Sequence, residues 1–156
     1  METLEGLAFE RIVAEATEEL SRKGLGFAVT NRVRGYWNRP RSADASVELD
    51  LVAWNRDDRV VRFGSCKRRS DKHDAQALSR FRAHVETFVS STGRRFAEWR
   101  REHVLFSPKF TQEQRTRLEA EEWICRDLSD LRRSLRPADR GERGMSRTAA
   151  KILGED

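Results

Sequence analysis

Residues 48–67 read ELDLVAWNRDDRVVRFGSCK, and this stretch decides the fold of the chain. Two runs rich in β-branched and aliphatic residues, 46–55 and 59–67, flank the polar segment Asn55-Arg56-Asp57-Asp58. A polar turn between two such runs is typical of a β-hairpin. We therefore expect two neighbouring antiparallel strands, with short acidic and basic motifs at their outer ends.

Side chains of a strand point alternately to its two faces, so alternation predicts a shared face for Glu48 and Asp50. The expected sets in the first strand are Val47, Leu49, Leu51 and Ala53 on one side and Glu48, Asp50, Val52 and Trp54 on the other. In the second strand one face carries Val61, Phe63, Ser65 and Lys67. Carboxylates beside a lysine favour a Mg²⁺ site acting on a phosphodiester, because a hard cation prefers carboxylate oxygens and the lysine stabilises negative charge.

Asp50 is the residue in this stretch that most needs an explanation. A carboxylate within an aliphatic strand is unfavourable by several kcal/mol unless it is hydrogen-bonded, ion-paired or metal-bound. A site residue is one interpretation, and a buried Asp50–Lys67 ion pair without metal is the other. For Glu48 the alternative is an ordinary solvated side chain at the edge of the sheet.

Composition limits the classes of function. The 156 residues suffice for one domain with a sizeable core. A net charge of +5 and a pI of about 9.7 favour a polyanionic partner, although a solvated, charge-rich surface has the same composition. The three histidines and two cysteines do not occur at zinc-ligand spacing, so we expect no zinc. We also expect no ATPase activity, because no GxxxxGK[ST] phosphate loop is present.

The chain has neither an apolar run of membrane-spanning length nor a signal-peptide pattern, which predicts a cytoplasmic protein without membrane association. Hydrophobic periodicity predicts one domain over residues 1–135 and a basic, flexible tail over 136–156. The expected elements are a helix at 3–23, strands at 26–37, 46–55 and 59–67, a helix at 74–90, a strand at 102–107, a helix at 111–122 and a strand at 123–128. The order αβββαβαβ predicts an α/β fold with a central mixed sheet flanked by helices.

Several short motifs, in this order, resemble those of the PD-(D/E)xK nuclease superfamily. Asp50 and Lys67 match its central aspartate and lysine. The motifs are similar to those of one branch in particular, the nuclease-like C-terminal domain of unknown function in archaeal-type AAA ATPases. The matching segments are Gly6–Glu10, Tyr36-Trp37, Glu48–Ala53, Phe63–Lys67, Val104–Ser107, Phe110-Thr111 and Cys125–Leu128, and together they span roughly residues 4–132. The chain departs from the pattern at Ser65, where the family carries a second acid.

This resemblance implies a restriction-endonuclease-like core that binds nucleic acid. It implies Asp50 and Lys67 as catalytic residues and Glu10 as a metal ligand. Glu48, which alternation places on the face of Asp50, completes the expected catalytic set, so a Mg²⁺ or Mn²⁺ ion would be held by Asp50, Glu48 and Glu10, with its affinity lowered by Ser65. We expect the basic residues that follow the second strand to grip the nucleic-acid backbone, namely Arg68, Arg69 and Lys72. The alternatives are a catalytically inactive interaction domain that works with an AAA ATPase in cis or in trans, and a homodimer formed through a sheet edge.

Overall fold

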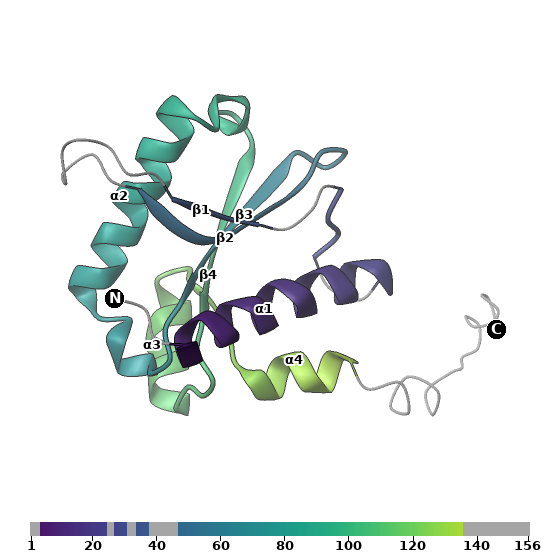
Figure 1. Cartoon of the computed structure of the whole chain (residues 1–156). Helices are drawn as coiled ribbons and strands as arrows, with labels where there is room; N and C mark the ends of the chain where they lie inside the picture. The colour runs from purple at the N-terminus through teal and green to yellow at the C-terminus, as the bar shows by residue number, and fades with distance from the viewer. Residues whose placement is uncertain (1–3, 25–26, 31–33, 38–46, 136–156) are drawn as a thin grey trace.

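The computed structural model describes residues 4–24, 27–30, 34–37 and 47–135 (Figure 1). The elements in chain order are α1 (Leu4–Arg22), β1 (Arg34–Trp37), β2 (Glu48–Asn55), β3 (Val60–Cys66), the 3-10 turn η2 (Ser70–Lys72), α2 (Ala75–Ser91), the 3-10 turn η3 (Arg94–Phe96), β4 (Arg100–Phe106), α3 (Gln112–Ala120), β5 (Ile124–Arg126) and α4 (Leu128–Leu135). The predicted order is confirmed, with α4 as an addition.

The strands form one five-stranded sheet in the order β1-β2-β3-β4-β5. β1, β2 and β3 are antiparallel neighbours, whereas β3, β4 and β5 run parallel. The parallel pairs need crossovers, and α2 and α3 provide them. The predicted α/β fold with a central mixed sheet is therefore confirmed.

Helices cover both faces of the sheet (Figure 1). The apolar stripe of α2 packs on one face, where its buried residues are Phe81, Val85, Phe88 and Val89. On the other face α1 and α4 lie side by side, and they bury Phe9, Val13, Ala16, Leu20 and Leu131. None of the described helices is long and apolar enough to cross a membrane.

The hairpin forms as predicted, but the alternation expected along its first strand is wrong beyond Leu49. Arg34 of β1 pairs with Val52, and Tyr36 pairs with Leu49. An advance of two residues along β1 therefore corresponds to three residues along β2. Such an extra residue is a β-bulge, and it shifts the side-chain alternation by one position. Leu49 and Val52 consequently share the α2 face, whereas Leu51 packs on the α1 and α4 face.

Two further predictions need correction. Phe27–Thr30 is not a strand, since Val29 donates its N–H to Ser21 Oγ (2.9 Å) and Thr30 donates to the carbonyl of Trp54 (2.9 Å). Helix α4 was not predicted, although Asp127 and Asp130 cap its start reciprocally through their backbone N–H groups and carboxylates (2.9 and 3.0 Å). The tail predicted for 136–156 lies outside the described residues.

Candidate functional site

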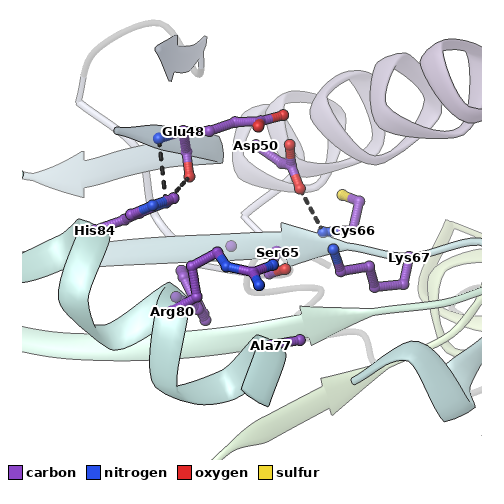
Figure 2. A pocket seen from close by; sticks show the side chains of 10 residues that line it. Glu48, Asp50, Ser65, Cys66, Lys67, Ala77, Arg80 and His84 are labelled. Atoms are coloured by element: carbon purple, nitrogen blue, oxygen red, sulfur yellow. Dashed lines mark hydrogen bonds between the residues drawn. The ribbon is translucent and has the colours of Figure 1, made fainter. Parts of the chain in front are cut away.

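A pocket opens where β2 and β3 stop pairing. The last backbone pair of their ladder is Leu51 with Gly64. Beyond it, the N–H of Cys66 donates to Oδ2 of Asp50 at 2.8 Å, so a side chain accepts the bond that a backbone carbonyl would otherwise take (Figure 2). A carboxylate that accepts a buried N–H is satisfied there, which gives Asp50 a structural role whatever else it does.

Lys67 leaves the end of β3 from a firmly held backbone. Its N–H donates to the carbonyl of Phe106 (2.9 Å), and its own carbonyl accepts from the fully buried hydroxyl of Ser107 (2.8 Å). Its side chain reaches back toward Cys66 and Asp50 (Figure 2). Asp50 and Lys67 therefore lie at the same end of the hairpin, and an ion pair between them stays a prediction.

The pocket encloses about 160 Å³ between the sheet and α2. Its lining comes from three elements: Glu48 and Asp50 from β2, Gly64, Ser65, Cys66 and Lys67 from the end of β3, and Ala77, Arg80, Phe81 and His84 from α2. We call it the β2–β3 pocket. It brings together four residues that the sequence singled out, which are Glu48, Asp50, Ser65 and Lys67.

Helix α2 contributes two polar residues that sequence reasoning missed. Arg80 extends across the pocket toward Ser65 (Figure 2). His84 fixes the start of β2, because its Nδ1 lies 3.2 Å from the backbone N and 3.1 Å from the carbonyl O of Glu48. Nδ1 accepts from the N–H when it carries no proton and donates to the carbonyl when it does. Arg80 and His84 lie four positions apart, which puts them on one face of α2 and is the signal that could have revealed them.

The remaining predicted residues lie outside the pocket lining. Glu10 belongs to α1, the helix on the opposite face of the sheet from α2. Arg68 and Lys72 are exposed on the segment that follows β3. Arg69 is bound to Asp71 through two hydrogen bonds of 2.7 and 3.1 Å, so much of its hydrogen-bonding capacity is already used.

The donor set bears on the metal implied by the resemblance. Within the described parts of the chain, no three His, Cys, Asp or Glu side chains lie close enough to hold a metal ion. The pocket offers two carboxylates, of which Asp50 already binds Cys66, and it also holds the cations of Lys67 and Arg80. These groups do not fit an ion held by protein ligands alone. The set Asp50, Glu48 and Glu10 stays a prediction.

His73 follows the 3-10 turn η2 and is only 3% exposed. Burial lowers the pKa of His73 to about 4, against the opposing effect of its hydrogen bond to the Phe106 carbonyl, and the positive charge of Lys67 lowers it further. A neutral ring donates Nε2–H to that carbonyl at 3.1 Å. His73 therefore joins the segment after β3 to the end of β4, and it does not line the pocket.

Comparisons with known proteins add little to this geometry. No known protein family and no curated protein matches the chain. A solved structure, the crystal structure of a repair endonuclease from Pyrococcus abyssi, is similar to it with a TM-score of 0.44 and 19% sequence identity. The match covers 82% of this chain and 47% of that one, so this chain spans less than half of the endonuclease's length. What the chain does is therefore inferred from its own residues.

Proposed function

We propose that this chain binds the phosphate backbone of a nucleic acid, with the β2–β3 pocket receiving one phosphate group. The observation that carries the proposal is the convergence of Lys67 and Arg80 on a pocket of about 160 Å³ that also offers the Ser65 hydroxyl. This volume is below the roughly 300 Å³ at which pockets begin to hold whole small molecules. It suits a single anionic group of a longer ligand.

The two cations would supply the binding energy. Hydrogen bonds from ionised donors to phosphate are roughly twice as strong as neutral ones. The backbone of Lys67 is fixed to Phe106 of β4 and to Ser107 by two hydrogen bonds, so the main chain from which its side chain extends is already ordered before a phosphate binds. Arg68 and Lys72, exposed just beyond the pocket, are placed to contact neighbouring phosphates without reading bases.

The two carboxylates of the pocket repel an anion, so the pocket by itself should bind a phosphate group only weakly. Glu48 and Asp50 line the same pocket as the cations, and their charge offsets that of Lys67 and Arg80. We therefore propose that the affinity for nucleic acid falls steeply as the salt concentration rises. The reason is that most of the binding free energy would come from counterions released from the nucleic acid, and less from a positively charged cavity. Hydrolysis stays a prediction that follows from the resemblance.

The test is fluorescence anisotropy with labelled single- and double-stranded DNA and RNA over a series of salt concentrations. We expect Lys67→Ala and Arg80→Ala to weaken binding, and to reduce the duplex salt slope by about 0.9 for each phosphate that the variant no longer neutralises. The matched control is Arg117→Ala, which removes the same charge from an exposed position on α3. Equal affinity of the three variants would overturn the proposed site.

Incubating the same substrates with Mg²⁺ or Mn²⁺ distinguishes an enzyme from a binding domain. Cleavage that is abolished by both Asp50→Ala and Lys67→Ala would establish a nuclease that works without a second acid at position 65. Salt-sensitive binding without cleavage would leave a nucleic-acid-binding domain. Absence of both would favour the other predicted role, an interaction domain of an AAA ATPase.

A further inference from the structure

A second and larger pocket lies on the opposite face of the sheet. It encloses about 350 Å³, and we call it the α1–α4 pocket. Its lining residues are Thr17 and Leu20 of α1, Phe27, Arg62 of β3, Phe106 of β4, Arg126 of β5, and Asp130 and Leu131 of α4. The volume falls within the range of about 300 to 1,000 Å³ that is typical of small-molecule sites.

One wall of this pocket is built around a largely buried arginine. The Arg62 guanidinium lies over the ring of Phe27, 4.6 Å from its centroid, and its Nε and Nη2 donate to Oε1 of Glu102 (3.0 and 2.7 Å). Nη1 makes no hydrogen bond within the described part of the chain. Burial lowers the pKa of Arg62, the bonds to Glu102 raise it, and the nearby charge of Arg126 lowers it again.

Arg126 carries the charge that the pocket does not balance. Its Nη1 donates to the Cys125 carbonyl at 2.8 Å, and no carboxylate among the described residues pairs with it. The Asp130 carboxylate of the same pocket is already engaged by Arg115 (3.0 Å) and Arg133 (3.5 Å). A positive charge beside a second arginine, above an apolar wall, is stabilised when an anion binds between them.

We propose that the α1–α4 pocket binds a mononucleotide, with its phosphate on Arg126 and the free edge of Arg62. Leu20, Phe27, Phe106 and Leu131 form the apolar wall against which the base packs. The pocket is large enough for a nucleoside monophosphate, in contrast to the β2–β3 pocket. This site is independent of the proposed function, because the two pockets share no lining residue.

Isothermal titration of the whole chain with adenosine 5′-monophosphate tests the site. We expect saturable binding that Arg126→Ala weakens about 10- to 100-fold, the effect of one charged hydrogen-bonding group, while Arg126→Lys recovers part of it. Arg132→Ala, on the exposed side of α4, is the matched control and should leave binding unchanged. Inorganic phosphate alone should bind more weakly, because it lacks the apolar body.

Two further arms determine what the ligand is and where it binds. A 5′-phosphorylated oligonucleotide that binds more tightly than the free mononucleotide, and depends on Arg126, would identify a strand end as the source. The Lys67→Ala and Arg80→Ala variants should bind the mononucleotide normally. No saturable binding at millimolar concentration, binding unaffected by Arg126→Ala, or binding abolished in Lys67→Ala would each overturn the proposal. Unchanged thermal unfolding of Arg126→Ala confirms that this exposed substitution leaves the fold intact.

Discussion

The two pockets lie on opposite faces of one sheet and differ in how the chain builds them. All lining residues of the β2–β3 pocket come from two short segments, the hairpin around 48–67 and one face of α2. The α1–α4 pocket collects residues from Thr17 to Leu131, contributed by helices, strands and a loop. The first is small and mixes two acids with two cations, whereas the second is larger and has an apolar wall. The motif at 48–67 therefore indicated the β2–β3 pocket in advance, whereas the α1–α4 pocket forms only when α1 and α4 pack on the sheet.

The largest effect is expected from a core side chain that also lines the β2–β3 pocket. Phe81 is 5% exposed, lines the β2–β3 pocket and stacks on Trp123 with ring centroids 5.8 Å apart. We expect Phe81→Ala to lower the free energy of unfolding by about 3 to 5 kcal/mol, because it leaves a cavity in the core. Urea denaturation measures the decrease, and Phe81→Leu should cause a smaller one. A decrease below about 1 kcal/mol would contradict this packing.

Acid should weaken the link that His73 forms between the segment after β3 and the end of β4. His73 has a pKa of about 4 when folded and 6.5 when unfolded, so the unfolded state binds more protons between these values. The stability is fully present above pH 6.5 and falls as the pH drops toward 4, by on the order of 3 kcal/mol. Urea denaturation from pH 7.5 to 4 measures it. His73→Gln, which does not titrate, should flatten the curve, and an unchanged slope would exclude His73 as the cause.

Gly64 offers a test of whether the two pockets can be disturbed separately. A Cβ at this position would lie 2.9 Å from Cε2 of Phe106 and 3.0 Å from Cβ of Leu51. We expect Gly64→Ala to destabilise the fold by about 1 to 3 kcal/mol through overpacking. Because Phe106 lines the α1–α4 pocket, mononucleotide binding should suffer more than nucleic-acid binding. Ser65→Ala, which removes a hydroxyl from the β2–β3 pocket, is the reciprocal variant and should weaken nucleic-acid binding more than mononucleotide binding. Equal effects of Gly64→Ala on both ligands would show that the pockets are coupled.

The smallest change in stability is expected from substitutions of Asp50, which distinguish its hydrogen bond to Cys66 from its negative charge. Asp50→Ala removes the acceptor of the Cys66 N–H and should lower the free energy of unfolding by about 1 to 2 kcal/mol. Asp50→Asn keeps an acceptor oxygen and should restore most of that stability. Chemical denaturation gives both values. If the asparagine variant is as unstable as the alanine variant, the charge itself, and not the hydrogen bond, holds the end of β3.

Much of the fold could be predicted from the sequence because the signals are local. The capping side chain of Asp74 accepts from Ala77 N (2.9 Å), and Thr111 forms a capping box with Gln114, as expected for the starts of α2 and α3. The hairpin forms because Asn55 Oδ1 accepts the N–H of Asp58 (2.9 Å) and closes the turn. Each of these interactions joins residues three positions apart.

Of the candidate site, sequence reasoning identified the residues of the hairpin and missed those of α2. The hydrophobic periodicity of α2 predicts its apolar stripe, but it does not predict which of the neighbouring polar residues, such as Arg80 and His84, line a pocket. The bulge in β2 was also hidden, because it is visible only in the pairing of Leu49 and Val52 with β1. A strand read in isolation gives strict alternation, and a partner strand is needed to reveal the extra residue.

The sequence by itself determined the hairpin, the helix starts and the order of the elements, since short-range hydrogen bonds and hydrophobic periodicity act between near neighbours. Only the tertiary structure decided that Arg80 faces Ser65, that Asp50 accepts the N–H of Cys66, and that Arg62 and Arg126 share a pocket. Those arrangements arise where helices pack on the two faces of the sheet. Their energies depend on groups far apart in the chain, whose distance and desolvation are set by the completed fold.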